Sequence, residues 1–279
     1  MKDVETTEIQ HVSDTALMAA AARALETSRP DGLVQDPFAA QLAGERGMDI
    51  LRGMPRSEFM AFGIGIRSRF LDQLVMRVVP NVSVVLNLGA GLDTRPWRLE
   101  LPSTLRWIEV DFPDMLRYKA KLLSASTPKC RLERMAADLN DPYARQALLS
   151  AIGRKPALMI TEGLLLYLLP ETVEGLASDS GDAGVKYWLF DLVSPELVQR
   201  IHDHSLEKVR APGDGGVHLL QIAGRTGWTV AERRSYVADA FAAAPERMRE
   251  IAERAAAAGQ TEPPPADDPS GVYLLERER

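Results

Sequence analysis

Cysteine, histidine and long apolar runs are scarce in this sequence of 279 residues, and each scarcity excludes a class of protein. The single cysteine, Cys130, cannot form an internal disulfide or build a zinc site made of cysteines. No apolar run approaches the ~18 residues of a membrane-spanning helix, and the first residues lack the apolar centre of a signal peptide. A net charge of −6 with no basic block argues against a general nucleic-acid binder. We expect a soluble, cytoplasmic globular protein with no metal, nucleic-acid or membrane partner.

Short apolar runs rich in β-branched residues predict the strands of a parallel sheet. The clearest run, residues 82–88, stops at Gly89, as a strand buried on both faces does. Helical stretches such as 114–124 and 142–152 separate most of the runs, and this alternation is typical of an α/β fold with helices on both faces of the sheet. The predicted strands are 82–88, 105–110, 132–137, 157–161, 186–192, 228–234 and 272–275, and the last could lie antiparallel at one edge.

Helical patterns dominate both ends of the chain. Apolar residues recur every three or four positions over 59–78, which indicates a helix with one buried face. The other predicted helices are 16–26, one that begins near Asp36, 195–209, 218–226 and 245–259. We expect a single domain, with a helical cap over residues 1–80, a core over 81–195, and a region over 196–279 that covers it.

A glycine turn after the first strand predicts the ligand class. Gly89 and Gly91 lie where an open α/β sheet binds its ligand. A dinucleotide fingerprint would place a third glycine where this chain has Thr94, so pyrophosphate binding is disfavoured. Asp111 ends the second strand, 20 residues beyond Gly91, and such an acid can accept hydrogen bonds from both hydroxyls of a ribose. A nucleoside without a pyrophosphate indicates S-adenosyl-L-methionine.

Four segments then carry a family resemblance. They are residues 87–98 (NLGAGLDTRPWR), 109–113 (EVDFP), 137–139 (ADL) and 161–167 (TEGLLLY). In this order they closely resemble the leucine carboxyl methyltransferase family. Residues 15–25 and 67–72 resemble its bacterial branch, which includes polyketide O-methyltransferases. The resemblance covers about residues 10 to 195 and implies a class I methyltransferase fold, a Rossmann-like, doubly wound, mostly parallel seven-stranded sheet with a helical N-terminal cap.

The resemblance also implies roles for individual residues. Arg67 would bind the methionyl carboxylate of the cofactor, and Glu162 would face its α-ammonium group. Gly89 and Gly91 would pass beneath the methionine and the ribose, whose diol Asp111 would hold. The adenine edge would contact Asp138 and the backbone of Leu139. Arg23 would be a second contact to the carboxylate.

Several of these positions have a plainer interpretation. An arginine on an amphipathic helix is often a solvated charge, and Arg69 competes with Arg67 for the predicted role. Asp138 could instead cap a helix, a role that suits Asp141 before Pro142 better. Asp93 and Thr94 are expected to stabilise the turn.

The catalytic demand depends on the methyl acceptor. A carboxylate has a pKa of about 4 and needs no base, whereas a phenol with a pKa near 10 would benefit from one. Tyr167 could line the substrate side, and His202 and His204 are the candidate bases, although two residues of a helix that are two apart point to different faces. Cys130 is expected to be exposed or packed at an edge, with no role as a nucleophile.

The sequence thus predicts an S-adenosyl-L-methionine-dependent O-methyltransferase that acts on a small molecule and releases S-adenosyl-L-homocysteine. A carboxylate acceptor is favoured over a hydroxyl, and natural-product tailoring is the expected context, for a monomer or a homodimer. The alternatives are a protein C-terminal carboxyl methyltransferase and a non-catalytic cofactor-binding protein. A nucleic-acid methyltransferase is disfavoured because the fourth strand leads into TEGL rather than an Asn/Asp-Pro-Pro-Tyr motif.

Overall fold

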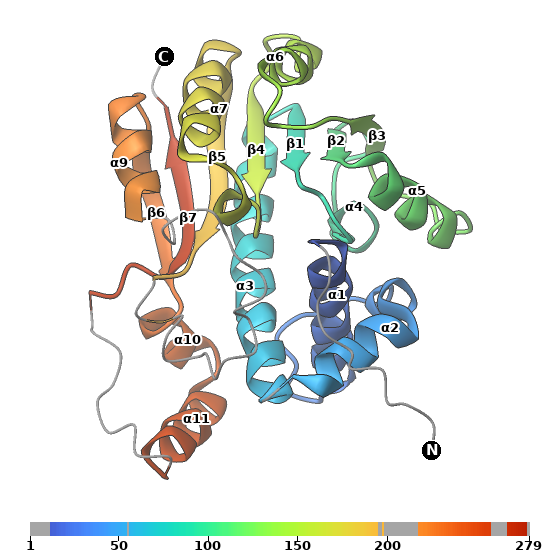
Figure 1. Cartoon of the computed structure of the whole chain (residues 1–279), viewed down its shortest axis with the longest axis vertical. Coiled ribbons are helices and arrows are strands. Elements are labelled where there is room, and N and C mark those ends of the chain that lie inside the picture. The colour runs from blue at the N-terminus through green and yellow to red at the C-terminus, as the bar shows by residue number, and fades with distance from the viewer. Residues whose placement is uncertain (1–11, 55, 195–196, 198–216, 258–266, 278–279) are drawn as a thin grey trace.

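The computed structural model describes residues 12–54, 56–194, 197, 217–257 and 267–277. A twisted sheet runs through the molecule with helices on both of its faces, and α1 and α2 lie beyond the end toward which β4 points (Figure 1). None of the described helices is long and apolar enough to cross a membrane.

The sheet has seven strands in the order β3-β2-β1-β4-β5-β7-β6. The first five pair in parallel, and β7 pairs antiparallel with both β5 and β6. Their bounds are β1 Val84–Leu88, β2 Arg106–Asp111, β3 Arg131–Ala136, β4 Ala157–Thr161, β5 Val185–Leu192, β6 Thr229–Ser235 and β7 Gly271–Glu276. The predicted α/β fold with a mostly parallel seven-stranded sheet is confirmed.

Alternating side chains of the strands feed two separate cores. In β1, Val84, Leu86 and Leu88 pack into the core on one face, while Val85 packs into the core on the other. Both sets are almost fully buried, so β1 has no solvent-exposed face.

The described helices include seven that the sequence predicts and three, over 95–98, 170–182 and 238–243, that it does not. In chain order the described helices are α1 Val12–Ser28, α2 Ala39–Gly53, α3 Ser57–Val78, α4 Arg95–Arg98, α5 Pro113–Leu122, α6 Pro142–Ala151, α7 Pro170–Asp182, α9 Val217–Arg225, α10 Ala238–Ala243 and α11 Pro245–Ala257, with the short 3-10 turns Val79–Asn81 and Leu165–Tyr167. The predicted helix over 195–209 lies outside the described residues.

The N-terminal helices form a cap around a small core that also includes Leu92, Trp97 and Leu123. Ala20, Ala21 and Ala22 of α1 are fully buried, and such small side chains allow the neighbouring helices to approach closely. Across the molecule, Arg247 of α11 binds the fully buried Glu26 of α1 through two hydrogen bonds of 2.8 and 2.7 Å. The cap is therefore connected to the C-terminal part of the fold.

One expectation about the sheet is wrong. The predicted last strand is antiparallel, but it lies inside the sheet, between β5 and β6, instead of at its edge. Four of the five described positions 271–275 are among the most buried of the chain, which only an inner strand can achieve. The edge is occupied by β6, whose residues are exposed or half-buried.

Candidate active site

The carboxyl ends of the parallel strands bring the predicted site residues to one edge of the sheet. Gly89 follows β1, Asp111 ends β2 and Glu162 follows β4. Because the strand order places β1 between β2 and β4, the chain leaves β1 in one direction for β2 and returns on its other side for β4. Ligands of open α/β sheets bind at such a switch point.

The glycine turn is fixed to the acid at the end of β2. Gly89 and Gly91 have φ values of +61° and +43°, in the left-handed region that favours glycine. A Cβ atom on Gly89 would lie 2.9 Å from a methyl group of Leu164. The amide N–H of Gly91 donates to Asp111 Oδ2 at 2.7 Å, and that of Phe112 donates to Oδ1 at 2.7 Å. Asp111 therefore has a fixed, half-buried carboxylate beside a turn that presents bare backbone.

Two further predicted residues, Asp138 and Leu139, follow the third strand, β3. Asp138 is exposed, and its Oδ1 accepts from the backbone N–H of Asn140 at 2.9 Å. Leu139 is buried, with its carbonyl oxygen accepting from Arg145 at 2.7 Å. The aromatic side chain of Phe112 is 58% exposed between the ends of β2 and α5, an unusual exposure for so large an apolar group. The capping role belongs to Asp141, which accepts from Tyr143 N and begins α6, as predicted.

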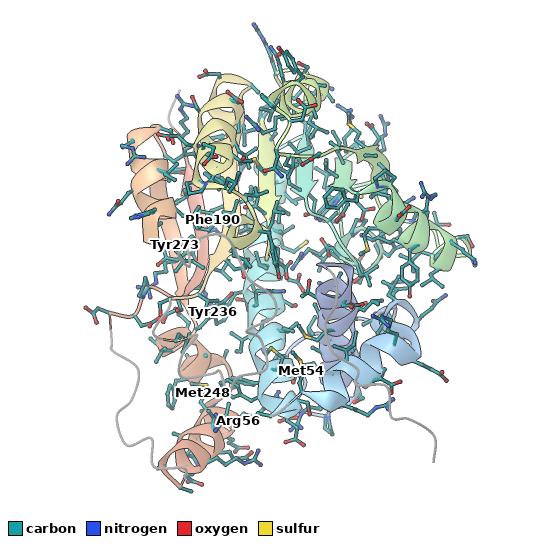
Figure 2. All side chains as sticks on the ribbon, in the orientation of Figure 1. Met54, Arg56, Phe190, Tyr236, Met248 and Tyr273 are labelled. Atoms are coloured by element: carbon teal, nitrogen blue, oxygen red, sulfur yellow. The ribbon has the colours of Figure 1, made fainter. Side chains whose placement is uncertain are left out.

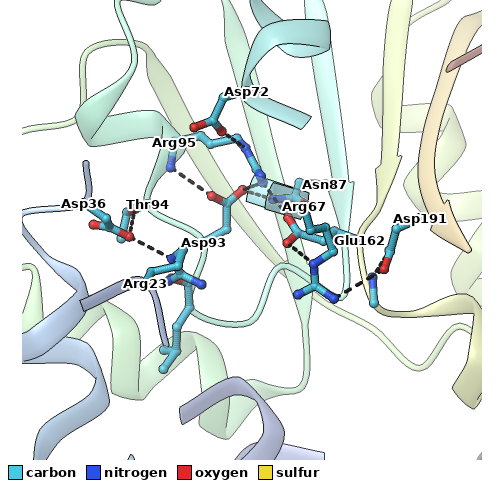
Figure 3. Close-up of polar contacts among 12 residues, drawn as sticks. Arg23, Asp36, Arg67, Asp72, Asn87, Asp93, Thr94, Arg95, Glu162 and Asp191 are labelled. Atoms are coloured by element: carbon cyan, nitrogen blue, oxygen red, sulfur yellow. Dashed lines mark hydrogen bonds and ion pairs between the residues drawn. The ribbon is translucent and has the colours of Figure 1, made fainter. Parts of the chain in front are cut away.

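Arg67 and Glu162 lie in contact, although 95 residues separate them in the sequence. Arg67 Nε is 3.0 Å from Glu162 Oε1, and Arg67 Nη1 is 3.3 Å from Asp191 Oδ2 at the end of β5 (Figure 3). The second oxygen of Asp191 accepts from the N–H of Gly163 at 2.6 Å. A cationic and an anionic side chain thus lie side by side at the switch point.

A fully buried arginine holds Glu162 from the other side. Arg95 of α4 donates to Glu162 Oε2 at 2.7 Å, to Asp72 Oδ1 at 2.7 Å and to Asp93 Oδ2 at 3.1 Å. Asp93 Oδ2 also accepts from Asn87, and Asp93 Oδ1 from the N–H of Arg95. The predicted role of Asp93 in stabilising the turn is confirmed.

These contacts form one chain of ion pairs, hereafter the ion-pair chain. Arg98 bonds Asp72 and lies 4.0 Å from Asp36, which accepts from Arg23 at 2.9 Å and from Thr94 at 2.7 Å. Its members come from α1, the loop before α2, α3, the glycine turn, α4, the residue after β4, and β5. They are Arg23, Asp36, Arg67, Asp72, Asp93, Arg95, Arg98, Glu162 and Asp191. Five carboxylates and four guanidinium groups give the chain a formal charge of −1.

Burial and charge act in opposite directions on the acids of this chain. Burial raises the pKa of Glu162, but Arg95 and Arg67 outweigh it, so that the pKa falls below its usual range. Asp93 behaves in the same way, with Arg95 as its main cation. For Asp191 burial prevails over the attraction of Arg67, and the pKa is raised. Glu162 and Asp93 are therefore held as anions, whereas Asp191 is the easiest acid of the chain to protonate.

Arg23 lies away from the contact between Arg67 and Glu162. Its Nε donates to Asp36 and one terminal nitrogen donates to the carbonyl oxygen of Leu92 at 2.7 Å. These bonds join α1 to the glycine turn. The predicted contact of Arg23 with the carboxylate of the cofactor stays a prediction. It would have to use the second terminal nitrogen, which makes neither of these bonds.

Of the residues considered for a catalytic role, the structure describes Tyr167 and Cys130 but not the two histidines. Tyr167 is half-buried, and burial raises the pKa of its phenol although a hydrogen bond with Thr15 opposes the shift. His202 and His204 lie outside the described residues. Cys130 is buried where the edge strand β3 begins, so that the alternative of an exposed thiol is wrong.

Sequence reasoning missed Arg95 and Asp191. Both carried a usable signal, because Arg95 lies inside the glycine-turn segment and Asp191 is an acid at the end of a buried strand, as Asp111 is. The partners of the two residues, Glu162 and Arg67, lie far along the chain, and no local pattern indicates these pairings.

Comparison with known proteins identifies the same segments. A family model described as leucine carboxyl methyltransferase matches residues 16–180. A predicted S-adenosyl-L-methionine-dependent methyltransferase of Frankia alni is 36% identical over 181 residues, which are 60% of this chain and 63% of the relative. One from Mycolicibacterium smegmatis is 31% identical over 220 residues, 71% of each chain. The match thus spans less than two thirds of the length of the first of these relatives.

Solved structures agree in fold. A DUF574 family protein from Streptomyces avermitilis has a TM-score of 0.56 at 16% identity, with 93% of this chain and 97% of that chain covered. A predicted methyltransferase from Thermobifida fusca has a TM-score of 0.55 at 17% identity, with 95% and 94% covered. At this level of identity the likeness establishes the fold alone.

Proposed function

Since the chain belongs to the leucine carboxyl methyltransferase family, we propose that it is an S-adenosyl-L-methionine-dependent O-methyltransferase. The observation that carries the proposal is the contact of Arg67 with Glu162 at the switch point, beside the glycine turn that Asp111 fixes. The proposed acceptor is a carboxylate on a small molecule, and the proposed context is the tailoring of a natural product. No metal takes part in this proposal, so a chelator should leave turnover unchanged.

The residues at this edge suit the parts of that cofactor. Arg67 can pair with a carboxylate and Glu162 with an ammonium group, and an α-amino acid presents both on one carbon. Gly89 and Gly91 offer backbone without a Cβ atom to a thioether chain. Asp111 is an acceptor for two ribose hydroxyls, and Asp138, the N–H of Leu139 and the face of Phe112 suit an adenine.

The formal charge of the ion-pair chain supports a cationic ligand. S-adenosyl-L-methionine carries a sulfonium, an ammonium and a carboxylate, with a net charge of +1, against −1 for the chain. The demethylated product has lost the sulfonium charge and is neutral. The same residues therefore attract the methyl donor more strongly than the product, which assists product release.

A carboxylate acceptor asks little of the protein beyond alignment. When bound, the cofactor supplies a methyl group on a positive sulfur, which an anionic oxygen can take without proton transfer. Tyr167, with a raised pKa, is a poor base at neutral pH. A hydroxyl acceptor would also need a base, a role that the raised pKa of Tyr167 does not suit.

Titration calorimetry with S-adenosyl-L-methionine and S-adenosyl-L-homocysteine tests the cofactor assignment. We expect micromolar binding that Arg67→Ala and Asp111→Ala each weaken at least about tenfold, or about 1.4 kcal/mol. Arg69→Ala is the matched control, because Arg69 is on the same helix but outside the ion-pair chain, and it should bind as the unaltered protein does. No binding, or an equal loss in all three variants, contradicts the proposal.

A panel of acceptors then separates the functions. Methyl transfer to small aromatic or alkyl acids supports the proposal, transfer to phenols alone supports the hydroxyl alternative, and transfer to a C-terminal peptide carboxylate supports a protein substrate. Binding of the cofactor without transfer to any of them indicates a non-catalytic binding protein.

A further inference from the structure

One buried hydroxyl near the ion-pair chain has no partner in the fold. The phenolic oxygen of Tyr236 is inaccessible to solvent and makes no hydrogen bond. Buried polar groups are nearly always bonded, and leaving one unbonded lowers the stability of the folded state, so an exception calls for a reason. Nearby Tyr273, in contrast, donates its hydroxyl to the carbonyl oxygen of Pro269 at 2.5 Å.

The register of the sheet places Tyr236 on the face and edge that carry Asp191. Asp191 of β5 and Arg234 of β6 both pair with Val272 of β7, so the three lie in one row and share a face. Tyr236 follows two residues after Arg234 and so continues on that face, one step beyond the carboxyl end of β6. Figure 2 shows it between α3 and the ends of β5 and β7.

The contacts of Tyr236 join it to the helix that bears Arg67. Its ring packs against the core cluster that includes Phe62, Ile66 and Phe70 of α3. Burial raises the pKa of Tyr236 strongly, and the carboxylate of Asp191 raises it further. The phenol therefore stays protonated and can act as a hydrogen-bond donor but not as a base.

One arginine of β6 shares the face of the sheet with Tyr236. Arg234 lies over the ring of Phe70, donates to the neutral side chain of Gln73 and lies 3.9 Å from Glu232. Arg233 lies over the ring of Tyr273 and so belongs to the opposite face. The charged side chains that act on the Tyr236 phenol are Asp191, Arg67 and Glu162, so the unpartnered hydroxyl lies close to the contact that carries the proposed function.

We propose that the Tyr236 hydroxyl donates a hydrogen bond to the carboxylate of the methyl acceptor and so positions it opposite Arg67 and Glu162. This inference rests on the proposed function and names the residue that selects its acceptor. In the transfer, an oxygen of the acceptor carboxylate forms the bond to the methyl carbon while the bond from that carbon to sulfur breaks and its electron pair stays on sulfur. No proton moves, so a donor that cannot ionise is sufficient. The bonded carboxylate oxygen is held while the other one reacts.

The test compares Tyr236→Phe with Tyr273→Phe, because each variant removes one buried hydroxyl and nothing else. Benzoate, phenylacetate and butyrate are titrated into the protein saturated with S-adenosyl-L-homocysteine, which prevents turnover, and thermal unfolding is recorded for the ligand-free proteins. We expect Tyr236→Phe to bind the acids at least about tenfold more weakly, with unchanged affinity for S-adenosyl-L-homocysteine and an equal or higher Tm. Tyr273→Phe should bind the acids normally and have a lower Tm.

Three results would overturn the inference. They are unchanged acid affinity in Tyr236→Phe, an equal loss of affinity for S-adenosyl-L-homocysteine, and a drop in Tm like that of Tyr273→Phe, which would show that the hydroxyl serves the fold. If no acid binds the unaltered complex, the inference fails with the carboxylate assignment. Binding of S-adenosyl-L-homocysteine in the same experiment still leaves the cofactor assignment standing.

Discussion

Replacing Arg95 with methionine tests whether the ion-pair chain holds the site together. Methionine fills much of the same volume but removes a charge that binds three carboxylates, and Arg95 is only 2% exposed. Asp72 keeps its bonds to Arg98, and Glu162 keeps Arg67. Asp93 keeps the side-chain amide of Asn87, so each acid retains a partner and the loss falls at the low end of the range for a broken buried pair.

That low end is about 3 kcal/mol of the free energy of unfolding. For a chain of this size the loss corresponds to a fall in Tm of roughly 6–12 °C. The loss of stability in Arg95→Lys should lie between that of Arg95→Met and zero, because an ammonium group keeps the charge but cannot reach three carboxylates at once. Thermal and urea unfolding at pH 7 measure both effects.

The pH dependence separates charge from packing. The pKa values of Asp93 and Glu162 are lowered in the folded state, with Arg95 the main cation responsible. An acid with a lowered pKa adds stability above its unfolded pKa of about 4, and this stability disappears as the pH falls through the folded value. The stability gap between the unaltered protein and Arg95→Met should therefore narrow below about pH 4.

A gap of constant size from pH 7 to pH 3 would refute the reasoning, because a packing defect does not depend on pH. A loss of less than about 1 kcal/mol at pH 7 would do so as well, since buried carboxylates would then tolerate the absence of their cation.

Three further predictions concern other residues. Gly91→Ala should lower the free energy of unfolding by about 1–2 kcal/mol through backbone strain alone. Gly89→Ala should lower it by more, because the added methyl group also meets the side chain of Leu164, and equal losses of the two variants in urea unfolding would contradict this crowding. Burial raises the pKa of Cys130 to about 11, so we expect less than about 1% thiolate at pH 8 and no reaction with a thiol reagent until unfolding, and rapid labelling of the folded protein would count against it. Arg247→Met should lower the free energy of unfolding by about 3–5 kcal/mol, because it leaves the buried carboxylate of Glu26 without its cation. A change in Tm of under about 2 °C would contradict this and show that the carboxylate is neutralised in another way.

The sequence predicts most elements of the sheet because its central strands are buried on both faces. Residues 157–161, for example, form a strand with the predicted bounds, since a short apolar run between turns admits few other structures. The place of β7 was beyond such reasoning, because its neighbours are decided by pairing with residues 185–192, some 80 positions away. Local pattern decides that a strand forms, and long-range pairing decides where it lies.

The candidate site divides in the same way. Gly89, Asp111 and Glu162 could be found because each ends or directly follows a strand, and the topology brings strand ends together. Arg95 and Asp191 have a similar local signal, but their role depends on partners that lie up to 67 and 124 residues away and that no local pattern indicates. Tyr236 becomes a candidate only once its hydroxyl is known to be buried without a partner.

The bond between Arg247 and Glu26 has a consequence for how the chain folds. The two residues are 221 positions apart, so when a ribosome has made α1, α2 and the whole parallel sheet, the guanidinium group that Glu26 needs has not yet been synthesised. Until then the carboxylate has a backbone N–H of Leu33 as a partner but no cation, and its full burial is unfavourable. Docking of the N-terminal helices is therefore expected to be a late event that waits for α11, with a high contact order and a slow rate, while the parallel strands assemble earlier.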